Sequence, residues 1–246
     1  MNQSIALLEL GEIEKAIDAV QIAIELNPRY VEAWNMLGVA YKTKEDWEAA
    51  KAAFQNTLEI NPDYGEAWIN LCGVLQKLDL PEEAIVAGEK GVACCPHAPE
   101  AYYNLGGGLK DCWRYLEAIE KYRKSIELDP SYFDAYLNLS KCLIKIDEPL
   151  KAEEIAAKAI EIDPDHESGY INHGLALCCR GELRAGALSY YRAAKRNPDA
   201  PEPHANLGFA LLALEEFSTG WDEFEYGFLT DSRGPVIDTP TPVWKG

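Results

Sequence analysis

A proline recurs at a fixed interval through the chain. The sequence has 246 residues, and successive members of the series are 34 residues apart: Pro28, Pro62, Pro96, Pro130, Pro164 and Pro198. A period of this length, kept over most of a chain, is typical of a solenoid, in which each small unit packs on its neighbours. The series therefore predicts an array of repeats rather than one globular core.

Each 34-residue unit contains two helical patterns. With the proline at repeat position 32, full repeats begin at Val31, Gly65, Pro99, Phe133, Glu167 and Pro201. Apolar residues recur at positions 4, 7, 8 and 11 and again at positions 20, 24, 27 and 28, which is the spacing of one helix face in each half. Positions 8 and 20 hold small residues, so two helices can pack closely. The unit is predicted to be a helix-turn-helix pair that the proline ends.

These columns resemble those of the tetratricopeptide repeat (TPR) family. In the first full repeat they are carried by Trp34, Leu37, Gly38, Tyr41, Ala50, Phe54 and Pro62. The resemblance implies an all-α fold, a right-handed α-solenoid (superhelix) of about seven 34-residue helix-turn-helix repeats. It also implies that the first helix of every pair lines the inner, concave surface.

The register divides the chain into a solenoid at residues 1–231 and a proline-rich capping or linker tail at residues 232–246. A partial repeat is expected at 1–30, followed by repeats at 31–64, 65–98, 99–132, 133–166, 167–200 and 201–231. Ser232 stands where the last unit would need its proline, so the array is expected to end there.

One column of the first helix holds asparagine in five consecutive repeats. A helix advances about 100° per residue, so position 6 lies opposite the packed stripe and should face the groove. An asparagine amide offers one acceptor and two donors, which match the C=O and N–H of a peptide group. The row is similar to the asparagine ladder of the O-linked N-acetylglucosamine transferase superhelix, which implies that it holds an extended polypeptide. Its members are Asn70, Asn104, Asn138, Asn172 and Asn206.

A structural role for the same column is the alternative. Most side-chain hydrogen bonds go to nearby backbone or water, so each amide could bond the neighbouring repeat and fix the stacking. The two roles can coexist. One hydrogen bond contributes about 0.5–1.5 kcal/mol net, whereas ordering one peptide residue costs about 1–2 kcal/mol. The row alone therefore predicts weak binding that does not depend on the partner's sequence.

Acidic residues at position 2 flank the asparagines. Glu66, Glu100 and Asp134 would favour a basic or neutral segment, and Tyr103 at position 5 is a further candidate contact. The alternative is that these acids only complement the helix dipole, which is worth about 0.3–1 kcal/mol. No lysine or arginine stands at positions 2 and 5, so the basic clamp of chaperone-binding TPR proteins is not expected.

Three consecutive glycines, Gly106, Gly107 and Gly108, occupy positions 8 to 10 of one first helix. Only position 8 is expected to need a small residue for packing, and each further glycine costs about 1 kcal/mol relative to alanine. Close approach of a bound chain, a bend in the helix and sequence drift all remain open.

The composition excludes several classes of partner and chemistry. The 41 acidic and 23 basic residues give a net charge of −18, which argues against binding nucleic acid or an anionic membrane. The apolar runs are too short for membrane insertion, and we see no signal peptide, so a cytoplasmic protein with reduced cysteines is expected. The sequence has no catalytic motif and no metal or cofactor motif, so we expect no enzyme activity from this chain, no metal and no cofactor.

The C-terminal segment leaves two functions open. Its tryptophan- and proline-containing motifs at 220–226 and 239–246 resemble the junction in bacterial TPR proteins that carry a glycosyltransferase-like domain. The first function is a protein-interaction scaffold that binds an extended peptide or a helix in its groove. The alternative is the substrate-recognition region of a bacterial protein glycosyltransferase whose catalytic domain lies beyond residue 246. Self-association through exposed solenoid ends is a third idea, because Trp221, Phe224 and Phe228 crowd the last helix.

Overall fold

The computed structural model describes residues 11–230, with side chains to residue 227. This part of the chain is all-α and falls into two compact units, with the boundary between Asn138 and Leu139. The helices are α2 (Ile13–Leu26), α3 (Val31–Thr43), α4 (Trp47–Ile60), α5 (Gly65–Lys77), α6 (Pro81–Cys94), α7 (Pro99–Asp111), α8 (Tyr115–Leu128), α9 (Phe133–Lys145), α10 (Pro149–Ile162), α11 (Glu167–Cys179), α12 (Leu183–Arg196), α13 (Pro201–Ala213) and α14 (Phe217–Thr230). The predicted tail at 232–246 lies outside the described residues.

Local signals set the helix boundaries. The first helices of the full repeats begin at the six residues that the proline register predicts. The second helices α2, α4, α8 and α10 end before a residue with an extended backbone, such as Asp129 with φ −134° and ψ 96°. This residue precedes the recurring proline, whose ring disfavours helical geometry in the residue before it. The recurring proline therefore separates one helix pair from the next.

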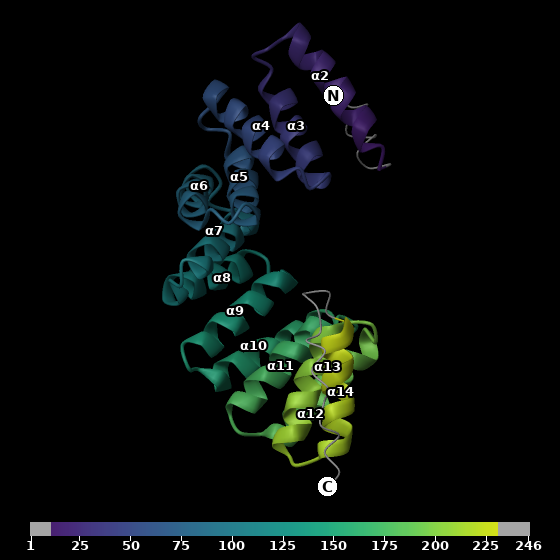
Figure 1. The fold of residues 1–246 in the computed structure, drawn as a ribbon. Coiled ribbons are helices and arrows are strands. Elements are labelled where there is room, and N and C mark those ends of the chain that lie inside the picture. Colours follow the sequence, from purple (N-terminus) through teal and green to yellow (C-terminus); the bar gives the residue numbers. More distant parts are fainter. Residues whose placement is uncertain (1–10, 231–246) are drawn as a thin grey trace. The chain divides into compact units, whose positions relative to one another are not determined.

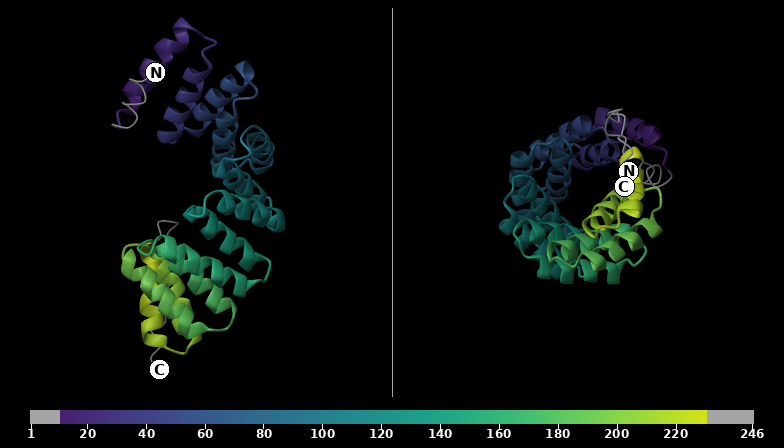
Figure 2. Two further views of the ribbon diagram at one scale, coloured as in Figure 1. Left: turned by 180° about the vertical axis from the view of Figure 1, so that it is seen from behind. Right: turned by 60° about the horizontal axis from the view of Figure 1, so that its bottom comes forward.

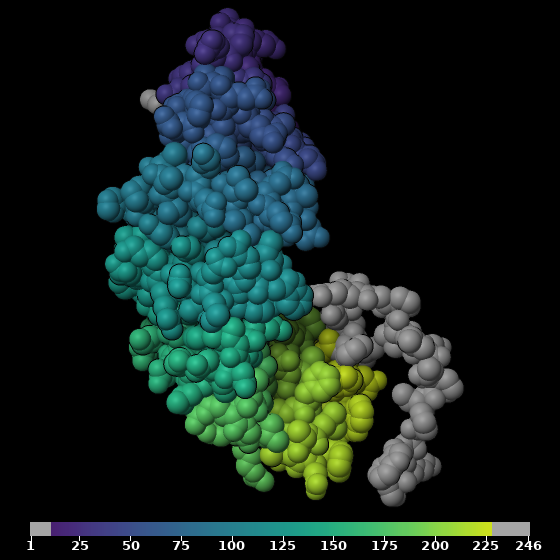
Figure 3. Space-filling view, turned by 90° about the vertical axis from the view of Figure 1, so that its left-hand side faces the viewer, coloured from purple at the N-terminus to yellow at the C-terminus, as the bar shows by residue number. Residues whose placement is uncertain are grey.

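Helix pairs stack in chain order within each unit (Figures 1 and 2). In unit 1, α3 packs on α4, α5 on α6 and α7 on α8, and each of α5 and α7 also contacts the second helix of the preceding pair. In unit 2, α11 and α12 and then α13 and α14 form the same arrangement. The space-filling view shows residues 11–138 as successive colour bands, each against its neighbours in sequence (Figure 3). The prediction of an α-solenoid built from helix pairs is confirmed.

Matched residues at positions 8 and 24 fill the space between the two helices of a pair. A Cβ added to Gly38 would lie 2.6 Å from the Phe54 ring, and one added to Gly106 would lie 2.8 Å from the Tyr122 ring. The next repeat reverses the sizes, because Cys72 occupies position 8 and Gly88 occupies position 24. The volume is thus shared between the two positions, which keeps the packing dense.

In most first helices the side chain at position 4 forms a hydrogen bond with the turn before the helix. Trp34 Nε1 donates to Pro28 O at 2.9 Å, and Tyr102 Oη donates to Pro96 O at 3.2 Å. The same contact joins Trp68 to Pro62, Tyr136 to Pro130 and His204 to Pro198. The sequence analysis assigned position 4 only to the apolar stripe of the first helix. The recurring proline therefore contributes an acceptor as well as a helix end.

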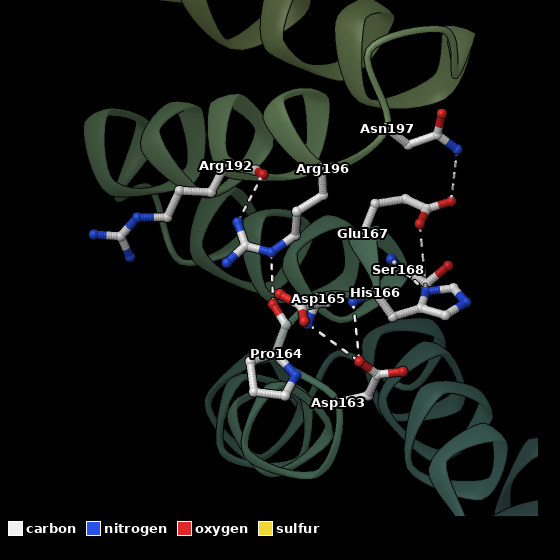
Figure 4. A network of polar contacts seen from close by, with 9 residues as sticks. All are labelled: Asp163, Pro164, Asp165, His166, Glu167, Ser168, Arg192, Arg196 and Asn197. Atoms are coloured by element: carbon white, nitrogen blue, oxygen red, sulfur yellow. Dashed lines mark hydrogen bonds and ion pairs between the residues drawn. The ribbon is translucent and has the colours of Figure 1, made fainter.

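An arginine makes this contact in the repeat that begins at Glu167 (Figure 4). Arg196 Nε donates to Pro164 O at 2.6 Å, and its Nη2 donates to Tyr170 Oη at 2.7 Å. The guanidinium also lies 3.8 Å from the centroid of the Tyr170 ring. Such cation–π contacts contribute about 0.5–2 kcal/mol. Arg196 is therefore engaged by contacts within unit 2, although its side chain is exposed.

Candidate functional site

The asparagine column places one amide per repeat on the first helices of unit 1. Asn70 lies on α5, Asn104 on α7 and Asn138 on α9. All three side chains are half-buried rather than fully exposed. The preceding repeat packs against this side of each helix, which the helix angle alone did not predict.

Two of these amides donate to the preceding repeat. Asn104 Nδ2 donates to Ile69 O at 2.9 Å, and Asn138 Nδ2 donates to Tyr103 Oη at 3.0 Å. Both bonds span 35 residues, so they connect position 6 of one repeat to position 5 of the repeat before it. The amides therefore contribute to the stacking of repeats.

The same two amides have hydrogen-bonding groups that the stacking bond does not use. An asparagine carries two N–H donors and a carbonyl oxygen with two lone pairs, and one donor is engaged here. The Oδ1 atoms of Asn104 and Asn138 accept no hydrogen bond from a described residue, and neither is among the buried unpartnered atoms of that region. Solvent therefore reaches these oxygens, and each is an acceptor in a fixed position.

Asn70 is held in a different way. Lys42 Nζ donates to Asn70 Oδ1 at 2.6 Å, so here the acceptor is engaged and both amide N–H groups remain. Burial lowers the pKa of Lys42, and the nearby Glu66 carboxylate opposes that shift. The lysine is half-buried beside the asparagine column. A basic group therefore borders the column, at a position that the sequence analysis did not consider.

Position 12 is the column that sequence reasoning missed. Lys42 contacts Asn70, and Gln76 Nε2 donates to Asn104 O at 3.0 Å, and both pairs are 28 residues apart. This separation joins position 12 of one repeat to position 6 of the next. Comparing position 12 of each repeat with position 6 of the next repeat, 28 residues later, would have found these pairs.

The glycine triplet is explained by packing. A Cβ on Gly107 would collide with the carboxamide of Gln76, and one on Gly108 would lie 3.3 Å from the backbone nitrogen of Ile85. All three glycines are buried. The expectation that only Gly106 serves packing is wrong, because position 9 makes room for the position 12 side chain of the preceding repeat.

The predicted acidic residues border the column as free carboxylates. Glu66, Glu100 and Asp134 are exposed and lie in the first turns of α5, α7 and α9. None of them forms an ion pair with another residue of the described range. They complement the helix dipoles, and they remain available to a cation from outside.

Tyr103 is largely part of the packing. Its ring centroid lies 5.1 Å from that of Tyr132 and 5.9 Å from that of Tyr122. Burial, and next the negative charge of Asp134, raise the pKa of Tyr103 to about 12. The neutral hydroxyl accepts the bond from Asn138, so Tyr103 orients that amide.

In unit 2 the column behaves differently. Asn172 Nδ2 donates to Ser140 Oγ at 3.0 Å, and the Asn172 side chain is only 1% exposed. A ligand cannot reach this amide in the structure, so Asn172 serves stacking here. Asn206 is half-buried and makes no hydrogen bond with another described residue.

Apolar residues are exposed near the C-terminal end of the described range. Phe209 is 58% exposed and Trp221 is 57% exposed, and both rings stack edge-on against Phe224. The side chain of Phe228 lies outside the described side chains. Self-association through this end stays a prediction.

Two general features complete the description. Within residues 11–230, no group of three or more histidine, cysteine, aspartate or glutamate side chains is arranged to hold a metal ion. In the same range, each helix is too short or too polar to cross a lipid bilayer.

Family models match three stretches of the sequence. A tetratricopeptide repeat model matches residues 31–64, a second one matches residues 114–170, and a TPR repeat model matches residues 6–45. The first stretch covers the helix pair α3 and α4, the second runs from α8 into α11, and the third includes α2 and α3. The chain is a tetratricopeptide repeat protein.

Solved TPR structures share this fold. A crystal structure of MamA is 27% identical, with a TM-score of 0.61, over 69% of this chain and 92% of MamA. PilF of Pseudomonas aeruginosa is 22% identical, with a TM-score of 0.67, over 78% of this chain and 88% of PilF. YrrB is 20% identical, with a TM-score of 0.58, over 74% of this chain and 94% of YrrB. No curated protein sequence gave a significant match.

Proposed function

We propose that this TPR protein is an interaction scaffold that holds an extended segment of a partner protein on the first helices of unit 1. The supporting observation is the row of Asn70, Asn104 and Asn138, in which every amide is fixed by one contact with the preceding repeat and keeps further polar atoms for a ligand. YrrB, described as a TPR protein with an unusual peptide-binding site, has the same fold, and its low identity supports no more than that.

The fixed amides would act mainly as acceptors. With Nδ2 bound to the repeat before it, Oδ1 of Asn104 or Asn138 can accept a backbone N–H of the bound segment. Neighbouring packed helices lie about 8–10 Å apart, and an extended chain advances about 3.3 Å per residue. Each repeat would therefore contact the segment once, and successive contacts would be about three residues apart in the segment.

Three hydrogen bonds cannot supply the affinity alone. At about 0.5–1.5 kcal/mol each, they offset the ordering of only a few peptide residues, each of which costs about 1–2 kcal/mol. The unpaired carboxylates of Glu66, Glu100 and Asp134 would add attraction for a segment with lysine or arginine. Partners that carry basic residues at intervals of about three are therefore favoured over neutral ones.

The alternative function uses the same row of amides. As the substrate-recognition region of a glycosyltransferase, the chain would hold the polypeptide to be modified. The segment that suggests this alternative, residues 232–246, lies outside the described residues. Sequencing the gene past the codon for Gly246 separates the two functions: a glycosyltransferase-like domain there supports the alternative, and an immediate stop codon contradicts it.

Substitution of Asn104 can separate binding from stacking. Asn104→Ala removes both the acceptor and the donor, whereas Asn104→Asp keeps an acceptor and loses the donor to Ile69 O. We would select peptides from a random phage library on the wild-type protein and measure the Kd of the best one for each variant. Asn104→Ala should raise the Kd about 2- to 12-fold, which corresponds to one hydrogen bond, and Asn104→Asp should raise it less, because the carboxylate still accepts but is no longer held by Ile69 O. Both variants should melt at a lower temperature than the wild type.

Asn56→Ala is the matched control. Asn56 lies on the second helix α4 and bonds only Ala52 O of its own helix, at 2.9 Å. This variant should bind as the wild type does. Unchanged binding by Asn104→Ala, together with a lower melting temperature, would show that the amide only fixes the stacking and would refute the proposal.

A further inference from the structure

One helix of unit 2 has a charge opposite to that of the chain. Helix α12, with the sequence LRAGALSYYRAAKR, carries Arg184, Arg192, Lys195 and Arg196 and no acidic residue. Every other helix of the described range contains aspartate or glutamate. The whole chain has a net charge of −18, so this helix is a local concentration of positive charge on an acidic protein.

The outer face of α12 is a basic and apolar stripe. Its members are Arg184, Leu188, Tyr191, Arg192 and Lys195, which follow the spacing of one helix face. All five are exposed, with Leu188 at 49% and Tyr191 at 47%. Lys195 Nζ lies 5.2 Å from the centroid of the Tyr191 ring. We call these five residues the α12 stripe.

The three cations of the α12 stripe have no ion-pair partner within the described residues. Arg184, Arg192 and Lys195 form no ion pair with any described residue. Arg196 provides the contrast, since its guanidinium is bound to Pro164 O and Tyr170 while that of Arg192 points away from the network (Figure 4). Contacts within unit 2 therefore account for Arg196 and leave the stripe unexplained.

On two other second helices the same positions carry compensating charges. On α8, Lys124 at position 26 pairs with Glu127 at position 29, with Nζ and Oε1 2.6 Å apart. On α10 these positions hold Lys158 and Glu161. On α12 they hold Arg192 and Lys195, so a lysine replaces the acid. The stripe is therefore a property of this repeat and not of the repeat fold.

We propose that the α12 stripe is a second binding surface, which takes an acidic polypeptide segment with an apolar side chain between its carboxylates. Arg184, Arg192 and Lys195 would pair with the carboxylates, and Leu188 would contact the apolar side chain. Arginine suits carboxylates because its planar guanidinium donates two parallel hydrogen bonds. A nucleic acid fits less well, since Leu188 stands at the centre of the stripe and Lys195 already lies over one face of the Tyr191 ring, where a base would stack.

The test uses the full chain and a synthetic probe. The probe is a fluorescein-labelled peptide of glutamate, alanine and leucine, in which each leucine is flanked by glutamates on one helical face. A peptide with glutamine in place of every glutamate is the first control, and an RNA oligonucleotide of equal charge is the second. Binding is measured by fluorescence anisotropy at several salt concentrations.

The test compares two triple variants that have the same net charge. Arg184→Gln with Arg192→Gln and Lys195→Gln removes the stripe, while Lys90→Gln with Arg123→Gln and Lys158→Gln removes three exposed cations from other second helices. Both changes take the net charge from −18 to −21, because three positive charges are lost. The stripe variant should bind the acidic peptide about 10-fold more weakly, and the control should bind as the wild type does. Leu188→Ala should weaken binding several-fold without loss of charge.

Several results would overturn the proposal. Equal losses in both triple variants would show that only net charge matters, and unchanged binding by the stripe variant would show that the stripe is not the site. Tighter stripe-dependent binding of the RNA would assign the surface to nucleic acid. Sedimentation that shows stripe-dependent dimers would make a second copy of the chain the occupant. Asn104→Ala should not affect this binding, so the outcome is independent of the groove.

Discussion

The second residue after the end of each first helix, from α3 to α13, has a left-handed backbone, and in most repeats it is not glycine. At position 15, φ is 61° at Glu45, 57° at Asp79, 62° at Trp113, 59° at Asp147, 83° at Gly181 and 65° at Glu215. An L-residue in this region is strained by about 1–2 kcal/mol, and aspartate tolerates it better than glutamate or tryptophan. Glycine at the glutamate positions should therefore stabilise the protein.

The expected change in the free energy of unfolding is the difference between two opposing effects. Glycine removes the strain, and it costs about 0.5–1 kcal/mol because the unfolded chain gains freedom. The net gain at Glu45 or Glu215, whose exposed side chains make no hydrogen bond or ion pair within the described range, is about 0.5–1 kcal/mol. The two sites lie in different units and share no contact partner, so the double variant should gain about 1–2 kcal/mol. At Trp113 the ring contact with Tyr115, at 6.1 Å, offsets most of the gain.

Urea unfolding followed by circular dichroism measures the gain, with hydrogen exchange of α3 and α13 to localise it. Lys44→Gly, measured against Lys44→Ala, is the control: Lys44 precedes Glu45 and has a right-handed φ of −79°, and both changes remove its ion pair with Glu14. Lys44→Gly should destabilise the protein relative to Lys44→Ala, and Gly181→Ala should destabilise it relative to the wild type. If Glu45→Gly destabilised the protein as much as Lys44→Gly, the strain argument would be refuted.

Two further predictions concern titrating groups. Burial lowers the pKa of His173 below its ordinary 6.5, against the opposing charge of Glu153, so on acidification the unfolded chain binds the proton first. The melting temperature should therefore fall as the pH drops through the range just below 6.5. It should fall less in His173→Leu, which has the leucine that the other full repeats carry at this position. An equal fall in the wild type and the variant would contradict this prediction. Burial raises the pKa of Cys72 to about 12, so a maleimide should label exposed Cys94 in the native protein and Cys72 only after unfolding, as mass spectrometry of digests would show.

The fold could be predicted from the sequence because its signals are local and repeated. The recurring proline, the small residues at positions 8 and 20 and the two apolar stripes each act within one repeat or between adjacent helices. From these signals the first residue of each first helix was predicted correctly in all six full repeats. The left-handed backbone at Trp113 could not be predicted, because nothing in its side chain favours that geometry and the packing of both flanking helices imposes it.

The candidate site was only partly predictable. The column containing Asn104 follows from the helix period, but how deeply each amide is buried depends on the residue that the preceding repeat places against it. Ser140 offers a small hydroxyl to Asn172, which becomes buried, whereas Ile69 offers only its backbone oxygen to Asn104, which stays half-buried. These neighbours are more than thirty residues away and belong to other columns, so one column could not reveal them.

The stacking bond and the proposed binding bond depend on the same side chain, and this limits what the groove can hold. An amide that donates to the preceding repeat cannot rotate, so its oxygen keeps one direction and a bound backbone must match it. In unit 1 this condition is met at Asn104 and Asn138, with Asn70 oriented by Lys42. At one contact per about three residues, these three positions engage a segment of about seven to nine residues. A shorter segment would lose one amide and its neighbouring carboxylate together, so affinity should fall in steps of about three residues rather than gradually.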